Sequence, residues 1–152
     1  MSTTLTKTKP KNNFGAGVVD TCVQGAPNKL TPSKMIEVIH TGLPIHELDA
    51  LQESLDVPMD KLAAKLGISK ATLHRRKAEG KLDAAESDRV VRFARLIGKA
   101  VKIFGSIEEA REWLHSPQFG LSGAVPLDYA ETEIGAREVE NLLGRIEYGV
   151  YS

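Results

Sequence analysis

The chain has 152 residues and a mass of 16.5 kDa, which is enough for one ordinary domain or two small ones. Hydrophobic residues make up 41% and charged residues 26%, a composition typical of a globular protein and not of a disordered one. No apolar run approaches the roughly 20 residues of a membrane span, and no apolar stretch follows the amino-terminal lysines as in a secretory signal. A single cysteine, Cys22, cannot form an internal disulfide, so we expect a cytoplasmic protein.

The formal net charge is zero, but the charges are separated along the chain. Residues 1–60 have a net charge of −2, whereas residues 61–104 hold twelve basic and four acidic side chains, a net charge of +8. Residues 105–152 hold three basic and nine acidic side chains, a net charge of −6. The basic block is a candidate surface for a nucleic acid, which the acidic section would repel. The separation therefore predicts two partners on two surfaces, with solvated helix faces as the alternative.

Residues 1–34 are rich in Thr, Lys, Asn, Gly and Pro and show little apolar periodicity. This composition predicts a flexible amino-terminal arm, which can end in a short ordered piece. The apolar run from Met35 to His40 is compatible with a strand or with a helical turn. Apolar residues at three- and four-residue spacing then follow Pro44, which predicts a helix that ends before Pro58.

The next stretch has the pattern of a helix-turn-helix motif. A first helix over residues 59–66 is followed by Gly67, where a left-handed backbone conformation is needed. Ser69 can cap a second helix, which Leu73 anchors to the interior. Ala63 supplies the small side chain that two steeply crossing helices need where they meet.

The second helix of such a motif lies in the major groove of DNA, with its amino-terminal side chains toward the base edges. Arg75 can donate two hydrogen bonds to a guanine edge, and Lys70 suits phosphates or bases. The expected DNA-binding residues are Ser69, Lys70, Thr72, His74, Arg75, Arg76 and Lys77, the last two near phosphates. Helix-turn-helix geometry also occurs in bundles that do not bind DNA, so the coincident basic block is the second argument for this assignment.

Two more helices are predicted after the helix-turn-helix motif. Gly80 ends the second helix of the motif, and Asp83 or Ser87 begins a longer one that Gly105 stops. Residues 106–109 have a capping-box pattern at the start of a short helix.

A last helix is expected from about Thr132 to Gly144, with its inward side chains at Ile134, Val139, Leu142 and Leu143. The fold class is therefore expected to be all-α, a helical bundle that contains the helix-turn-helix, followed by a smaller helical section. We expect three parts, namely the arm (1–34), a DNA-binding domain (35–104) and a carboxy-terminal section (105–152).

Residues suited to catalysis or metal binding do not form a recognisable set. The four histidines lack paired spacing and have no cysteine near them, which argues against a zinc or iron site. The chain has no P-loop, and the glycines after Phe119 lack the spacing of a dinucleotide-binding loop. Ser122 does not match a nucleophile elbow. The sequence therefore predicts no catalytic residue, no metal and no cofactor, so we do not expect an enzyme.

Two groups of motifs cover about residues 45–152. The first is the helix-turn-helix around Ala63, Gly67 and Leu73. The second comprises Phe104-Gly105-Ser106, Trp113-Leu114, Pro126-Leu127-Asp128, Gly135-Ala136-Arg137-Glu138-Val139 and the closing string from Leu142 to Tyr151. Together they resemble the Xre/MbcA/ParS family of type II antitoxins, in particular those paired with RES-domain toxins.

The resemblance implies an antitoxin that covers the active-site cleft of a co-expressed RES-domain toxin, an enzyme that degrades NAD, and that represses the shared operon. The expected toxin-binding residues are Arg145, Glu147, Tyr148, Val150 and Tyr151. The acidic section would complement a cationic cleft for the phosphates of NAD, and tyrosines are anchors that protein interfaces favour. For Tyr148, packing against its own helix is an equal alternative.

The rival hypothesis is a stand-alone dimeric transcriptional repressor whose acidic half only dimerises. Both hypotheses require a homodimer, because one helix-turn-helix reads too few base pairs and operators mirror the two-fold symmetry of the protein. The expected partners are therefore a cognate RES-domain toxin, operator DNA and a second copy of the chain, with no membrane. Deletion of residues 145–152 separates the hypotheses, since only the antitoxin would lose protection against a toxin.

Overall fold

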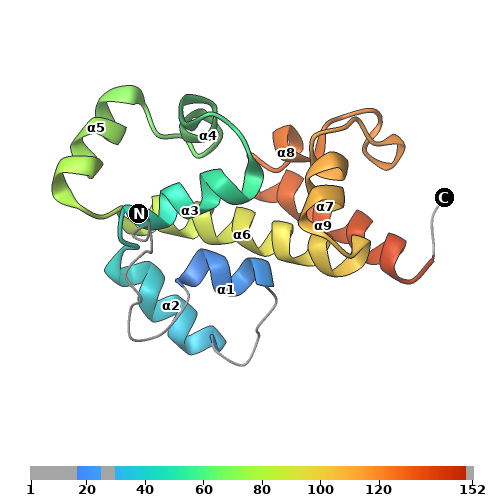
Figure 1. The fold of residues 1–152 in the computed structure, drawn as a ribbon, viewed down its shortest axis with the longest axis horizontal. Coiled ribbons are helices and arrows are strands. Elements are labelled where there is room, and N and C mark those ends of the chain that lie inside the picture. The colour runs from blue at the N-terminus through green and yellow to red at the C-terminus, as the bar shows by residue number, and fades with distance from the viewer. Residues whose placement is uncertain (1–16, 25–29, 150–152) are drawn as a thin grey trace, which may run out of the picture.

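The structure is a computed structural model that describes residues 17–24 and 30–149. All regular elements of this part of the chain are helical, which confirms the all-α expectation (Figure 1). In chain order they are α1 (Val18–Gln24), α2 (Pro32–Thr41), α3 (His46–Leu55), α4 (Met59–Lys65), α5 (Lys70–Glu79), α6 (Ala84–Phe104), α7 (Ile107–Leu114), the 3-10 helix η3 (Phe119–Leu121), α8 (Pro126–Tyr129) and α9 (Glu133–Glu147). None of these helices is long and apolar enough to cross a membrane.

Helix α6 is the central element, and it extends across most of the molecule (Figure 1). Its 21 residues begin at a capping box in which Asp83 and Glu86 each accept the backbone N–H of the other. It ends at Gly105, which has a φ of 96°. Helices α1, α2, α3, α7 and α9 all pack against it. The sequence left the start of this helix open between Asp83 and Ser87, and the structure places it after Asp83.

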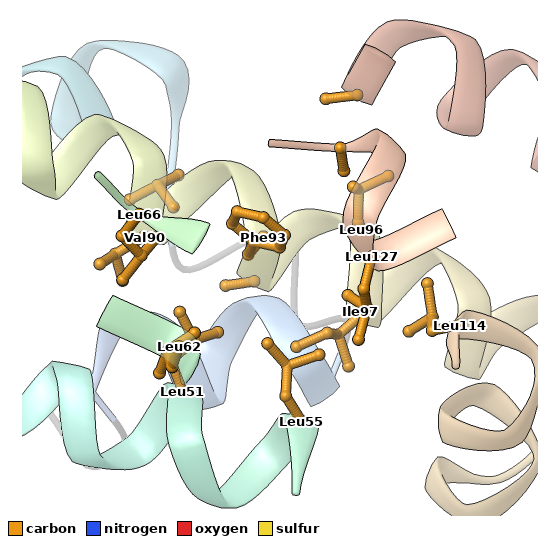
Figure 2. Packing of buried hydrophobic residues seen from close by; sticks show 14 of the residues in the cluster. Leu51, Leu55, Leu62, Leu66, Val90, Phe93, Leu96, Ile97, Leu114 and Leu127 are labelled. Carbon is orange, nitrogen blue, oxygen red and sulfur yellow. The ribbon is translucent and has the colours of Figure 1, made fainter. Parts of the chain in front are cut away.

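One continuous hydrophobic cluster joins both halves of the chain around α6 (Figure 2). Its buried members come from most of the helices, and those labelled in Figure 2 are Leu51, Leu55, Leu62, Leu66, Val90, Phe93, Leu96, Ile97, Leu114 and Leu127. Figure 2 shows Leu114 of α7 and Leu127 of α8 continuing the row of side chains that starts at Leu66 and Val90. The carboxy-terminal section therefore shares its core with the helix-turn-helix.

Helix α1 lies in the segment for which the sequence predicts a flexible arm that can end in a short ordered piece, and residues 18–24 are helical. The α1 helix packs on α6, where Gly98 leaves room for its backbone, since an added Cβ would lie 2.1 Å from the carbonyl oxygen of Cys22. The buried carboxylate of Glu47 accepts the first backbone N–H groups of α1, from Val18 at 2.8 Å and Val19 at 3.1 Å. A seven-residue helix is unstable alone, so α1 depends on its cap by the distant Glu47 and on its packing against α6.

Helices α2 and α9 each test one further prediction from the sequence. The run from Met35 to His40 is helical, because Thr31 caps α2 by accepting the backbone N–H of Lys34. The expectation that Ile134 points inward is wrong, since 78% of it is exposed. At about 100° per residue, Ile134 lies on the side of α9 opposite to Leu143, which is fully buried.

Polar contacts hold the carboxy-terminal section against the helices before α6. Arg111 of α7 donates to the carbonyl oxygens of Ser54 at 2.8 Å and Glu53 at 2.9 Å, at the end of α3. Lys65 at the end of α4 lies 2.5 Å from a carboxylate oxygen of Asp128. Lys65 also lies 3.4 Å from Glu131. These contacts satisfy helix ends and fix the two sections relative to each other.

Candidate functional site

The helix-turn-helix forms as the sequence predicts. Gly67 takes a φ of 73° between α4 and α5. The Ser69 hydroxyl accepts the backbone N–H of Thr72 at 3.1 Å and caps α5, while Leu73 turns inward. Gly80 ends α5 with a φ of 88°. The chain after α5 then pairs with the segment before α3, where Ile45 N–H donates to the Gly80 carbonyl at 2.9 Å.

Four of the predicted DNA-binding residues are exposed on α5 and lie on its outer surface, namely Lys70, His74, Arg75 and Lys77. The Arg75 side chain is 56% exposed, and its ion pair with Glu79 is long at 3.9 Å. Such a surface pair contributes little, so Arg75 can turn to another acceptor. The Ser69 hydroxyl donates a hydrogen bond to the Thr72 hydroxyl at 3.0 Å, so both side chains are part of the cap at the start of α5.

Arg76 differs from its neighbours, because it faces the interior and its side chain is only 13% exposed. Its Nε donates to Glu86 at 2.7 Å, and its Nη2 donates to Glu86 at 3.1 Å and to Asp83 at 3.0 Å. The hydrogen bond with Glu86 is the main cause that raises the pKa of Arg76 above its ordinary value. Arg76 therefore binds α5 to the start of α6, and its guanidinium group is already paired at the position where the sequence predicts a contact near phosphates.

The signal for this role was present in the sequence. Arg76 follows the inward-facing Leu73 by three residues, which places both on the same face of α5. Two acidic residues that can meet it, Asp83 and Glu86, begin the next helix. A basic residue on the apolar face of a recognition helix is thus a candidate for an internal ion pair.

The basic block is divided among several roles. Lys65 pairs with Asp128, and Arg92 lies 3.6 Å from Asp88. Arg89 donates to the carbonyl of Leu66 at 3.1 Å, at the end of α4. Only part of the charge of +8 therefore belongs to the face of α5.

The end of α9 presents the predicted toxin-binding residues that the structure describes. Arg145 and Tyr148 are exposed, and Tyr148 keeps 80% of its surface free, so it does not pack back on its own helix. Glu147 lies 3.9 Å from Lys102 of α6. Val150 and Tyr151 lie outside the described residues.

Phe119 is an exposed residue of the carboxy-terminal section that no pattern in the sequence singles out. It is 90% exposed, although the η3 turn that carries it is well fixed. The Gln118 side chain donates to the carbonyls of Trp113 at 3.0 Å and Ser116 at 3.1 Å, and an added Cβ on Gly120 would lie 2.7 Å from Leu142 of α9. The sequence shows only that Phe119 follows Pro117 by two residues and precedes Gly120, and this pattern does not reveal that its side chain is exposed.

Several residues of the carboxy-terminal motifs build the fold. Phe104 and Trp113 pack with ring centroids 5.5 Å apart, and Ser106 caps α7 by accepting the N–H of Glu109. Gly135 allows α9 to approach α8, since an added Cβ would lie 1.7 Å from the carbonyl oxygen of Tyr129. Among the described residues, no group of three His, Cys, Asp or Glu side chains is placed to hold a metal ion.

Three known antitoxins are similar to this chain, two of them over about three quarters of its length. The antitoxin Xre of Yersinia enterocolitica is 33% identical over 120 residues, which cover 78% of this chain and 81% of the relative. The chain belongs to the Xre family of antitoxins. The antitoxin Xre of Photorhabdus laumondii is 35% identical over 117 residues, or 76% of this chain and 79% of the relative. That of Pseudomonas putida is 35% identical over 68 residues, or 45% and 43%.

Two domains of the Xre family match successive parts of the chain. Residues 34–95 match the antitoxin Xre-like helix-turn-helix domain. Residues 99–149 match the antitoxin Xre/MbcA/ParS C-terminal toxin-binding domain. The family that the sequence resembles is thereby confirmed, and the chain is an antitoxin of a toxin–antitoxin pair. In this Xre-family antitoxin, α5 belongs to the first domain, and both η3 and the end of α9 belong to the second.

Proposed function

We propose that this antitoxin neutralises a RES-domain toxin that degrades NAD, by covering the active-site cleft of the toxin with the end of α9 and the η3 turn. The observation that carries the proposal is the exposure of two aromatic side chains, Tyr148 at 80% and Phe119 at 90%. Large aromatic residues of this kind are typical anchors of protein interfaces. The RES class of the toxin rests on the resemblance of residues 142–151 to antitoxins of that class.

The two aromatic residues can contact one partner at the same time. The η3 turn packs against Leu142, and Tyr148 follows Leu142 by six residues on the same helix. Figure 1 places the loop that contains η3 and the end of α9 toward the same end of the molecule. Because NAD must enter a toxin of this class through a cleft, an antitoxin that fills the cleft inhibits by steric exclusion.

The negative charge of residues 105–152 also supports a toxin with a cationic cleft as the partner. Residues 105–152 have a net charge of −6, and the acidic side chains Glu108, Glu109 and Glu112 on α7 are exposed. A cleft that binds the phosphates of a dinucleotide is expected to be cationic, so the two surfaces attract each other.

We also propose that a homodimer of this antitoxin represses its own operon, with α5 of each protomer in the major groove. The exposed side chains Lys70, His74 and Arg75 supply the contacts to bases, and Lys77 supplies a contact to phosphate. Arg76 is left out of this set because it is held by Glu86. A two-fold operator provides one half-site for each protomer.

The toxin interface is tested with the product of the neighbouring gene, by titration of purified antitoxin variants. Phe119→Ala and Tyr148→Ala are each expected to weaken toxin binding about 30-fold, which corresponds to the roughly 2 kcal/mol of an interface hot spot. Ile134→Ala is the matched control, because Ile134 is equally apolar and 78% exposed but lies at the start of α9. Thermal unfolding of all three variants should match the parent chain.

A second arm separates this proposal from the stand-alone repressor. Deletion of residues 145–152 should abolish protection against the toxin in growing cells while operator binding is kept. If the shortened chain still protects, the end of α9 does not cover the cleft. If no neighbouring gene product binds the full chain, the repressor hypothesis is favoured.

A further inference from the structure

Ala71 lies on the outer face of the recognition helix α5, among the side chains proposed above to contact the operator. It is exposed, and Figure 1 shows α5 at one end of the molecule and the end of α9 at the other. Ala71 is the second residue of α5, so it belongs to the part of a recognition helix that comes closest to the bases. Its methyl group has an apolar chemistry that the charged side chains around it do not supply.

The direction of Ala71 follows from the buried residue of the same helix. Leu73 is the buried side chain of α5 and marks its inner line. At about 100° per residue, Ala71 lies about 160° from Leu73 in one direction and Arg75 lies about 160° from it in the other. The outermost line of α5 therefore runs between Ala71 and Arg75, and no other residue of this helix lies as close to it.

The neighbouring side chains leave the methyl group of Ala71 uncovered. Arg75 pairs with Glu79, one turn further along α5, at 3.9 Å. Glu79 is itself held by Arg76, whose Nη1 donates to it at 3.2 Å. The Arg75 guanidinium is therefore drawn toward the end of α5 and away from Ala71. Ala71 thus presents a bare methyl group beside an arginine that can turn to a base edge.

The major groove of DNA offers one apolar group to such a side chain, namely the C5-methyl group of thymine. The other groups on the base edges are hydrogen-bond donors and acceptors, which alanine cannot satisfy and would separate from water. A thymine methyl group that packs on Ala71 is removed from water together with it, which is favourable. The contact therefore distinguishes thymine from cytosine, which lacks the methyl group, and from both purines.

We propose that Ala71 reads a thymine in each operator half-site through its C5-methyl group, beside a guanine that Arg75 reads. This contact rests on the proposed operator binding, and it names part of the base sequence that the binding prefers. Residues 71 and 75 are about one helical turn apart, a rise of about 6 Å, and successive bases of one strand are about 3.4 Å apart. The thymine is therefore expected within about two base pairs of the guanine.

The test uses the full chain and the promoter DNA of its own operon, with one thymine at a time replaced by deoxyuracil. This replacement removes only the C5-methyl group and keeps the hydrogen-bonding groups of the base. One thymine in each half-site is expected to be sensitive, and its replacement should weaken binding about fourfold, as expected for one buried methyl group. Fluorescence anisotropy at constant salt measures the dissociation constants.

The spacing of the two bases is measured in the same way. Each guanine is replaced in turn by 7-deazaguanine, which lacks the N7 acceptor that an arginine contacts. The guanine whose replacement weakens binding of the parent chain, but not of Arg75→Ala, is the one that Arg75 reads. A sensitive thymine more than about two base pairs from this guanine would overturn the proposal.

Two alanine variants assign the thymine contact to a residue. Ala71→Gly removes the methyl group of the protein and should abolish the difference between thymine and deoxyuracil at the sensitive position. Ala78→Gly is the matched control, because Ala78 is also exposed on α5 and its replacement costs the same helix propensity. It lies about 10 Å further along the helix, so this variant should keep the fourfold difference.

The replacements in the DNA test the parent chain itself, so the result does not depend on the folding of a variant. A parent chain that binds equally well after every thymine replacement would overturn the reading by Ala71 and leave the proposed operator binding intact. An Ala71→Gly chain that keeps the fourfold difference, or an Ala78→Gly chain that loses it, would also overturn the proposal. A parent chain that does not prefer its promoter to unrelated DNA would refute the proposed repression, and the thymine contact with it.

Discussion

At the scale of single residues, two adjacent arginines of α5 have opposite roles. Arg75 is exposed and weakly paired, whereas Arg76 is held by three carboxylates at the junction of α5 and α6. Their order in the chain does not distinguish them, but the face of the helix does. Since Glu86 is buried and also caps α6, the contact with Arg76 connects the recognition helix to the central helix.

The two arginines therefore form a matched pair of variants. Arg75→Ala is expected to lower operator affinity by roughly 1–3 kcal/mol and to leave the thermal midpoint unchanged. Arg76→Ala is expected to lower the thermal midpoint, because it leaves the buried Glu86 carboxylate without its partner. Fluorescence titration with operator DNA and thermal unfolding monitored by circular dichroism measure the two effects. An Arg76→Ala chain as stable as the parent would contradict the structural role.

At the scale of elements, helix ends follow local chemistry closely. Ser69, Asp83 and Ser106 each accept a backbone N–H at the start of a helix, and glycine takes the left-handed conformation after α5 and α6. Side-chain caps of this kind act over three residues, so the sequence is sufficient to place them. Helix α1 is the exception, since Glu47, 28 and 29 residues away, accepts its first N–H groups.

The close approach of α9 to α8 can be tested by substitution of Gly135. Gly135→Ala is expected to destabilise the chain by about 1–3 kcal/mol, because α9 must move away from the carbonyl of Tyr129. Gly144→Ala, in the same helix, is the control, since an added Cβ there meets only the end of the Lys99 side chain at 4.0 Å. It should stabilise the chain by about 0.5–1 kcal/mol. Urea denaturation measures both, and equal effects of the two substitutions would refute the close approach.

At the scale of the whole molecule, the two family domains share one core. Leu127 and Leu114 belong to the same cluster as Leu55 and Ile97, and Lys65 joins α4 to Asp128. A shared core means that neither section is expected to unfold alone.

The substitution Leu127→Ala, at a position that is 1% exposed, tests whether the two sections unfold together. The substitution should cost about 2–5 kcal/mol and should weaken the helix-turn-helix as much as the toxin-binding section. The fluorescence of Trp113 reports on α7, and circular dichroism reports on all helices. The two should show one coincident urea transition in the parent and in the variant. Two separate transitions would mean that the sections fold independently.

Local patterns in the sequence determined the helix-turn-helix, most helix ends and the all-α class. Turns, caps and apolar spacing act between near neighbours, so one chain is enough to infer them. Tertiary structure alone decided that residues 18–24 are helical and that Ile134 and Phe119 are exposed. Each of these outcomes depends on partners distant in the chain or on the direction that a helix face takes in the packed molecule, and local spacing contains neither.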